Sequence, residues 1–370
     1  MLTFLKQGLT IRNKGIATLA AALALSTLVS CGSSSPTHLA YIALRGANAV
    51  AVFRIDNSAN FTNIVGSPFA AGLSPSSVYG HPSKNFIYVA NQTENDISLF
   101  KVNNQSGGLT EILPRTATGI FPASLGMDAA GGFLFVANQA SNNISVYSIN
   151  SGTGALTEIS GSPFITGPSP VKLRVSPSGK FLYVLNSNLA SIYAYAIASG
   201  AGTLQPVGSF AAGPTPSSFA IDPTEHFLYV TNSSTSTVSV FTISGSGALA
   251  AIPTSPFSTT TTVSNTIPVD VAVSPSGQFL YVLNRTSNTI SEYSVSGAGV
   301  PTLLTASPAT LSGTAPGFIL FDSTGKFLLV GDQGSGAISI FSIGSDGTLA
   351  AGTSSGTTAG ASPSSMFIQP

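Results

Sequence analysis

One phrase recurs seven times along the chain, and its spacing constrains the fold more than any other feature. Each copy is an aromatic or apolar run that ends in Asn, a turn of four to six residues, and a second alternating run, as in residues 86–91 followed by 97–100. Further copies begin at Phe133, Phe181, Phe227, Phe279 and Phe327, with a weaker one from Leu39. Successive starts lie 47, 47, 48, 46, 52 and 48 residues apart. Short β-runs at such a period are typical of a β-propeller, so we predict an all-β fold with seven blades.

Each repeat divides into four strands. In the repeat around residues 170–210, strands are expected at 171–175, 181–185, 192–197 and 204–207. Pro177 and Gly179 mark a tight turn between the first two, because Pro presets φ and Gly tolerates a positive φ. Apart from the N-terminal segment, nothing shows a sustained helical period. The prediction is therefore four-stranded antiparallel blades without helices.

The two ends of the chain complement each other. Residues 362–368 resemble the innermost strand at 74–79 but are followed by no second strand, whereas the first repeat lacks an innermost strand. We therefore expect the C-terminal strand to join the N-terminal blade and close the ring, which removes free sheet edges. The predicted propeller domain spans residues 38–370.

Residues 1–31 have the features of a bacterial lipoprotein signal peptide. Lys6, Arg12 and Lys14 precede an apolar stretch at 15–29, which is short for a membrane span. The sequence Leu-Val-Ser-Cys at 28–31 resembles a lipobox, and Cys31 is the only cysteine, so no internal disulfide is expected. The alternative is an ordinary secretory signal with a chance cysteine. With lipid attached at Cys31 and a tether at 32–37, we expect the protein on the outer membrane or cell surface, or facing the periplasm.

Charge is scarce, and this excludes several functions. Charged residues make up 7% of the chain and the formal net charge is zero, against roughly 25% charged residues in ordinary proteins. No basic run is present, which argues against nucleic acid as a partner. No Cys, His or Asp cluster has metal-ligand spacing, so neither metal nor cofactor is expected. We expect a monomer that meets the membrane only through its lipid.

Residues 229–232 read Tyr-Val-Thr-Asn, and 88–91, 183–186 and 281–284 are close variants. With the Pro-Ser-Gly-x-Phe-Leu-Tyr-Val lead-in, the chain resembles the seven-bladed lactonase-type β-propellers, the family of 6-phosphogluconolactonase and YVTN-repeat surface proteins. The resemblance implies the propeller fold. It also implies one of several functions, since members include lactone hydrolases, muconate cyclases and propellers without established chemistry.

The resemblance also points to the mouth of the central channel, where the family's enzymes use His, Glu and Arg. Those enzymes often carry a His in the inner-strand phrase after Pro. The matching positions in this chain hold no His and read Ser77, Ser124, Lys172, Ser218, Asp270, Phe318 and Ser365.

Residues that repeat in every blade are interpreted as structural. The strand-end asparagines and the Asp of the inner turns are expected to bond the backbone of their own turns. Residues that break the repeat are better candidates for function, and Lys172, Arg174 and Asp270 are the charged ones on the channel side of the inner strands.

The two cations, Lys172 and Arg174, suit a carboxylate or phosphate ligand, or the oxyanion of a lactone under hydrolysis, with Asp270 as acid–base partner. The alternative is a salt bridge that fills a wet channel. His81, Glu225 and His226, in the inner turns, are weaker candidates for a general base.

Two functions follow from these observations. The first is a binding or interaction module with a protein or glycan partner, favoured by the low charge, the lipid anchor and the missing His. The alternative is a lactone hydrolase, 6-phosphogluconolactonase-like, that acts on a sugar-acid lactone at the channel mouth.

Overall fold

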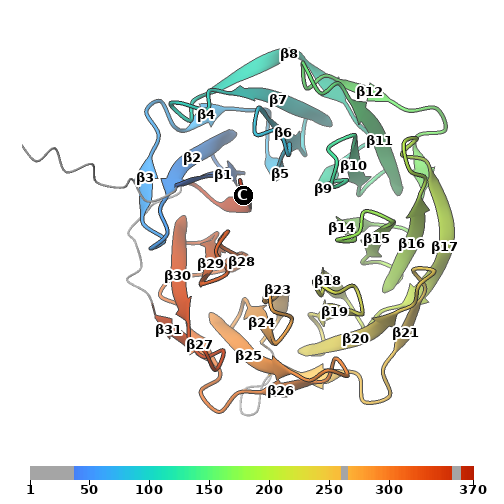
Figure 1. Cartoon of the computed structure of the whole chain (residues 1–370), viewed down its shortest axis with the longest axis vertical. Helices are drawn as coiled ribbons and strands as arrows, with labels where there is room; N and C mark the ends of the chain where they lie inside the picture. Colours follow the sequence, from blue (N-terminus) through green and yellow to red (C-terminus); the bar gives the residue numbers. More distant parts are fainter. Residues whose placement is uncertain (1–36, 260–265, 352–359) are drawn as a thin grey trace, which may run out of the picture. The chain divides into compact units, whose positions relative to one another are not determined.

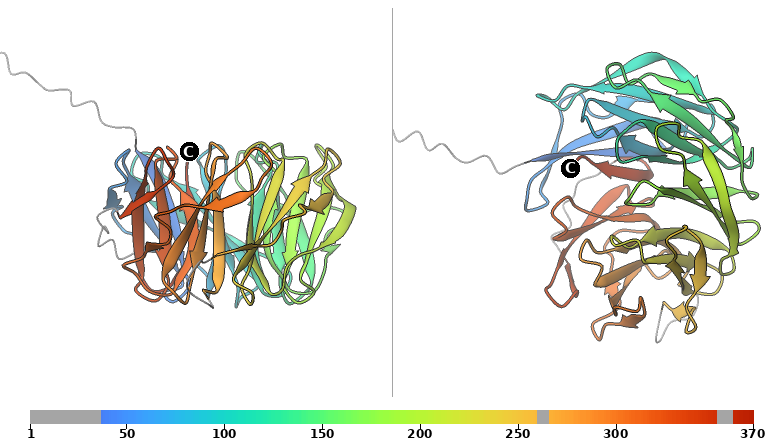
Figure 2. Two further views of the ribbon diagram at one scale, coloured as in Figure 1. Left: turned by 90° about the horizontal axis from the view of Figure 1, so that it is seen from below. Right: turned by 45° about the vertical axis from the view of Figure 1, so that its right-hand side comes forward.

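The computed structural model describes residues 37–259, 266–351 and 360–370. The predicted signal peptide, Cys31 and most of the tether lie outside this range. The described residues form strands and turns only, and they include no helix long and apolar enough to cross a membrane. Seven antiparallel sheets surround one axis (Figures 1 and 2), which confirms the predicted seven-bladed all-β propeller.

Six of the sheets, numbered here as blades 2 to 7, contain four strands that follow one another from the axis outward, and in blades 3, 5 and 6 a fifth, short strand also pairs with the third. Blades 2 and 3 are β5 (Pro75–Gly80), β6 (Phe86–Asn91), β7 (Asp96–Val102), β8 (Leu109–Ala117), and β9 (Pro122–Met127), β10 (Phe133–Asn138), β11 (Asn143–Ile149), β12 (Leu156–Glu158), β13 (Phe164–Ile165). Blades 4 and 5 are β14 (Pro170–Val175), β15 (Phe181–Asn186), β16 (Ser191–Ile197), β17 (Leu204–Ala211), and β18 (Pro216–Ile221), β19 (Phe227–Asn232), β20 (Thr237–Ile243), β21 (Leu249–Ala251), β22 (Phe257–Ser258). Blades 6 and 7 are β23 (Pro268–Val273), β24 (Phe279–Asn284), β25 (Thr289–Val295), β26 (Pro301–Leu303), β27 (Ala309–Thr310), and β28 (Pro316–Phe321), β29 (Phe327–Asp332), β30 (Ala337–Ile343), β31 (Leu349–Ala351).

Blade 1 is shared by the two ends of the chain, as predicted. It consists of β32 (Pro363–Ile368), β1 (His38–Leu44), β2 (Ala49–Ile55), β3 (Phe61–Asn63) and β4 (Phe69–Ala70). The innermost strand β32 pairs with β1, so that Tyr41 lies opposite Phe367. The Tyr41 hydroxyl also donates to Gln369 Oε1 at 3.0 Å. This pairing closes the ring of sheets.

The hydrophobic core is divided among the seams between neighbouring blades. At the seam of blades 1 and 2, buried Tyr41 and Val50 pack in one cluster with Val78 and Val89. A comparable cluster joins blade 1 to blade 7, the last in the chain. Each blade therefore depends on both neighbours for the burial of its apolar faces.

A Phe-x-Tyr phrase in the second strands of blades 2, 4, 5 and 6 fastens each of these blades to the next. The Tyr88 hydroxyl donates to the Gly154 carbonyl of blade 3 at 2.8 Å. The Phe86 ring covers the same glycine, whose φ is +74° and whose Cβ, if present, would lie 2.6 Å from that ring. A buried tyrosine hydroxyl needs an acceptor, and only glycine fits both the positive φ and the ring. The same tyrosine–glycine bonds recur as Tyr183–Gly247, Tyr229–Gly299 and Tyr281–Gly347.

The strand-end asparagines are structural, but their partners differ from the predicted ones. Asn91 Nδ2 donates to Ser98 Oγ at 3.0 Å and Asp96 Oδ1 at 2.7 Å on the third strand of its own blade, not to its turn backbone. The same pattern holds for Asn138, Asn232 and Asn284. These side chains are fully buried, so they tie the second strand to the third where water cannot compete.

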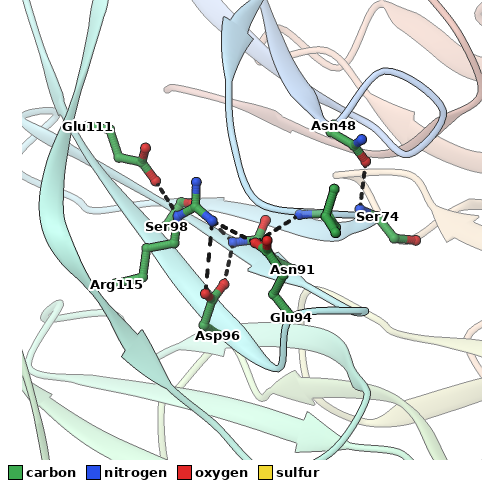
Figure 3. Close-up of polar contacts among 9 residues, drawn as sticks. Asn48, Ser74, Asn91, Glu94, Asp96, Ser98, Glu111 and Arg115 are labelled. Carbon is green, nitrogen blue, oxygen red and sulfur yellow. Dashed lines mark hydrogen bonds and ion pairs between the residues drawn. The ribbon is translucent and has the colours of Figure 1, made fainter.

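A second set of asparagines lies in the turns between second and third strands. Asn48 Oδ1 accepts the main-chain N–H of Ser74, just before the proline that starts the next inner strand (Figure 3). Ser74 has a φ of +58°, a region that non-glycine residues rarely occupy. The asparagine therefore stabilises the strained backbone conformation of the residue that precedes the inner strand. Equivalent bonds are Asn95–Phe121, Asn142–Ser169 and Asn288–Ala315.

Blade 4 lacks this contact, and the difference is testable. Ala190 occupies the equivalent turn with a φ of +44° and has no side-chain acceptor for Thr215, whose φ is +49°. We expect Ala190→Asn to raise the free energy of unfolding by about 1 kcal/mol, because Asn tolerates this φ and adds the missing hydrogen bond. Urea unfolding measures the change, with Asn142→Ala as the reverse control. If Ala190→Asn brings no gain in stability while Asn142→Ala destabilises the protein, this role is contradicted.

Blade 7 carries Asp332 where other blades carry the strand-end asparagine. The side chain is fully buried, Ser339 Oγ donates to its Oδ2 at 2.6 Å, and its Oδ1 has no hydrogen-bond partner among the described residues. Burial raises the pKa of Asp332 to about 6. When the pKa of a carboxyl is higher in the folded than in the unfolded state, the protein loses stability as the pH rises from the unfolded-state pKa to the folded-state pKa. Above the folded-state pKa the loss is complete and remains.

We therefore predict that Asp332→Asn stabilises the protein at pH 8 by about 2–3 kcal/mol and much less at pH 4. The measurement is urea unfolding of both proteins at the two pH values. Asn284→Asp is the matched control and should produce a loss that grows with pH. An equal gain at pH 4 and pH 8 would show that the buried carboxyl is not the cause.

Candidate functional site

The innermost strands of all seven blades surround a central cavity of about 810 Å³. It reaches the inner turns at one end, since His81, Asp128 and Ser323 line it. Figure 1 shows these strands around the axis. The walls are mixed, with aliphatic and aromatic side chains beside Lys172 and Arg174.

A partial ring of hydrogen bonds joins inner strands of neighbouring blades around this cavity. In blades 1, 2, 3 and 6 the side chain two residues after the first proline accepts a main-chain N–H from the following blade. Ser77 Oγ accepts from Leu125 at 3.1 Å, and Ser124 Oγ accepts from Leu173 at 3.2 Å. Ser365 makes the same bond across the closure, to Val78 at 3.4 Å. This position is therefore structural in most blades, which is why it is so often serine.

Lys172 interrupts this ring, because an ammonium group has no acceptor to offer. It is half-buried and lines the cavity, and its Nζ has no hydrogen-bond or ion-pair partner among the described residues. Burial lowers the pKa of Lys172, and the charge of Arg174 lowers it further, whereas Asp270 raises it. An anion that enters the cavity would stabilise the charged form of this amine.

Arg174 lies two residues further along β14. Its Nε donates to the Phe219 carbonyl of blade 5 at 2.7 Å, which fixes the guanidinium at the seam where the ring is interrupted. Its terminal nitrogens have no hydrogen-bond partner among the residues that the structure describes. They form a fork suited to a carboxylate or phosphate.

Asp270 was predicted as the acid–base partner of the two cations, and its carboxylate is engaged elsewhere. It is 3% exposed. Oδ1 accepts the Ser218 hydroxyl at 2.5 Å and the Val271 N–H at 3.0 Å, while Oδ2 accepts the Ile319 N–H at 3.0 Å. These bonds tie blades 5, 6 and 7 together, so the geometry gives Asp270 a structural role and does not support proton transfer by it.

The weaker candidates also make structural contacts. His81 lines the cavity, but its Nδ1 accepts the Ser83 N–H at 3.1 Å and its Nε2 lies 3.0 Å from the Gly131 carbonyl of the next blade. Glu225 accepts a bond from the Ser178 hydroxyl at 2.8 Å, which joins blades 5 and 4. His226 Nδ1 lies 2.9 Å from Thr224 Oγ1, and neither Glu225 nor His226 lines the cavity. The structure thus brings Lys172, Arg174, Asp270 and His81 together and leaves the other two outside.

Tyr79 is a cavity residue that the sequence analysis missed. It lies four residues after the first proline of β5, half-buried, with its ring centroid 5.2 Å from that of Phe367. Its hydroxyl has no hydrogen-bond partner among the described residues. Burial raises the pKa of Tyr79, Arg174 lowers it, and Asp128 raises it. At this position the other inner strands carry Gly126, Arg174, Ala220, Ala272, Leu320 and Phe367, so the signal in the sequence was one phenol hydroxyl. A neutral phenol does not stand out among charged residues that break the repeat.

A separate charged cluster lies in blade 2, away from the cavity (Figure 3). Arg115 contacts Glu94 at 2.6 Å, Glu111 at 2.7 Å and Asp96 at 4.0 Å, and these are the ion pairs of the described residues. Glu94 also accepts the Leu73 N–H at 3.1 Å. The cluster therefore secures the connection from blade 1 to blade 2. No group of His, Cys, Asp and Glu within the described ranges has the geometry of a metal site.

The comparisons with known proteins agree with this architecture. Among solved structures, a candidate 6-phosphogluconolactonase from Bacteroides fragilis has a TM-score of 0.78 at 21% identity, over 91% of this chain and 99% of that chain. The periplasmic gluconolactonase of Pseudomonas aeruginosa has a TM-score of 0.76 at 19% identity, over 90% of this chain and 99% of that chain. Identities this low show a common fold alone. None of the curated proteins matches the chain.

The family model described as "Lactonase, 7-bladed beta-propeller" matches residues 36–173, 166–264 and 244–363. These matches together span nearly the whole propeller, including the strands that carry the Tyr-Val-Thr-Asn phrase and its variants. The chain therefore belongs to the seven-bladed lactonase β-propeller family.

Proposed function

We propose that this propeller is a binding module that holds a small anionic ligand in its central channel. The observation that carries the proposal is the pair of cations on β14, Lys172 and Arg174, which line the cavity without an ion-pair partner among the described residues. The two carboxylates of the wall do not neutralise them by contact. Asp128 and Asp270 each accept main-chain N–H groups instead.

Physical chemistry favours a carboxylate or phosphate as the ligand. A half-buried cation has lost part of its hydration, and a charge-assisted hydrogen bond that it donates to an anionic ligand restores the lost stabilisation. The Arg174 fork binds such groups in a bidentate manner, and Lys172 supplies a point charge. Sugar acids, which are the ring-opened forms of sugar lactones, belong to this class of ligand.

Lactone hydrolysis is the second candidate function. It is favoured by family membership and by the fold shared with a protein described as a periplasmic gluconolactonase. Lys172 and Arg174 would stabilise the oxyanion that forms when water attacks the lactone carbonyl. The attack also requires a group that takes a proton from water. Asp270 and His81 are both held in hydrogen bonds, which is why binding ranks first.

We also propose that the propeller is held at the bacterial envelope through lipid on Cys31, as a monomer on the outer membrane or cell surface or facing the periplasm. The support is the lipobox-like sequence before Cys31. A protein or glycan partner on the propeller surface remains compatible with this arrangement, whereas the lack of basic runs argues against nucleic acid.

Calorimetric titration with gluconate and 6-phosphogluconate tests the channel, with glucose as the uncharged control. We expect saturable binding of the anions only, and a loss of about tenfold or more in affinity for Lys172→Gln and for Arg174→Gln. Lys180→Gln is the matched control, since Lys180 is exposed, belongs to the same blade and lies outside the cavity wall. Anion binding that survives both cavity substitutions would refute the assignment.

The same proteins, assayed in a pH-stat with the corresponding lactones, separate the two functions. Hydrolysis above the spontaneous rate that both cavity substitutions abolish would make the protein an enzyme. Binding without hydrolysis would support the binding module.

The lipid anchor predicts that Cys31→Ser moves the protein from the membrane fraction to the soluble fraction and abolishes incorporation of radiolabelled palmitate in a bacterial host. Propeller stability should be unchanged, because Cys31 precedes the first strand at His38. Retention of the label in Cys31→Ser would contradict the anchor.

A further inference from the structure

The wall of the central cavity differs between its two sides. Blade 4 contributes both cations, Lys172 and Arg174. Across the axis from β14 lie β28 and β32 of blades 7 and 1, and β5 of blade 2 follows β32 around the ring (Figure 1). The cavity-lining side chains of these three strands are mostly apolar or aromatic and include Tyr79, Leu320, Phe321, Met366 and Phe367, beside the serines Ser77, Ser364 and Ser365. A ligand that spans the cavity therefore meets positive charge at one end and apolar surface at the other.

Two aromatic rings give the apolar side a defined shape. Tyr79 and Phe367 lie with centroids 5.2 Å apart and ring planes 35° apart. Phe367 is held in place by close contact with Gly80, where a Cβ would come within 2.2 Å of the ring. Any larger residue at position 80 would displace it. The rings are thus fixed by packing and offer a surface on which a planar group can stack.

We propose that the channel selects a carboxylate with a planar apolar body, an aromatic carboxylate, over a polyhydroxylated sugar acid. This inference rests on the proposed anion-binding function and names its ligand class. The carboxylate meets Lys172 and Arg174, and the ring of the ligand lies against Tyr79 and Phe367.

Hydroxyl chemistry argues against a sugar acid in this orientation. A polyol placed against Leu320, Phe321 and Phe367 exchanges hydration for apolar side chains that offer no hydrogen bonds. Each hydroxyl left without a partner lowers affinity by roughly tenfold. An aromatic ring has no such groups to satisfy, and it gains from burial of its apolar surface.

The test is calorimetric titration of the purified protein with benzoate, gluconate and acetate. We expect benzoate to bind at least tenfold more tightly than gluconate. Tyr79→Ser should weaken benzoate binding by about tenfold and leave acetate binding unchanged, because acetate reports on the cations alone. Arg174→Gln should weaken both. Phe367→Leu, which keeps an apolar residue in the closing strand β32, is a second variant in case Tyr79→Ser disturbs folding.

The outcomes separate this inference from the proposed function. Gluconate or acetate binding that depends on Arg174, with no preference for benzoate, would overturn the ligand class and leave the anion site standing. A benzoate preference that persists in both Tyr79→Ser and Phe367→Leu would also overturn it. Failure of every anion to bind would overturn both proposals.

Discussion

Each innermost strand of the propeller has one edge without a partner strand, and the N–H groups along that edge must find acceptors elsewhere. In four of the blades the side chain two residues after the first proline accepts one of these N–H groups. Ser365, Ser77, Ser124 and Asp270 each accept an N–H from the next blade, so bonds run around the axis as well as within each sheet. The pairing of β32 with β1 places Ser365 where it can make this bond from blade 1 to blade 2. The apolar side chains of the two blades pack together at the same seam.

Three positions leave this ring, and they do so in different ways. In blade 5, Ser218 donates its hydroxyl to Asp270 Oδ1 of blade 6 instead of accepting an N–H. In blade 7, Phe318 replaces the acceptor and its ring fills the space over Gly331, where a Cβ would lie 2.1 Å from it, so the lost hydrogen bond is exchanged for packing. In blade 4, Lys172 replaces the acceptor and lines the cavity. Arg174 holds the seam instead, through the Phe219 carbonyl. The interruption at blade 4 therefore places two positive charges in the cavity wall. This is the reason to place the ligand there.

The sequence predicted the blades well, because every repeat encodes the same strands and turns and the spacing alone counts them. It also predicted the closure, since the two ends lack complementary strands. The site was predicted only in part. Lys172 and Arg174 were found because their charge breaks the repeat. The engagement of Asp270 was not foreseeable, since two of its donors are main-chain N–H groups, one of them from a strand 49 residues away. Tyr79 was missed because its repeat-breaking feature is a neutral hydroxyl beside a ring from the other end of the chain.

The proposed ligand site depends most on the two cations of β14 holding an anion. A crystal structure of the protein with millimolar selenate tests this directly, because selenium scatters anomalously and selenate has the shape and charge of a tetrahedral oxyanion. We predict a strong anomalous peak in the central cavity within hydrogen-bond distance of Lys172 Nζ and the Arg174 guanidinium. Peaks confined to the outer surface, with none beside these two side chains, would contradict the central claim.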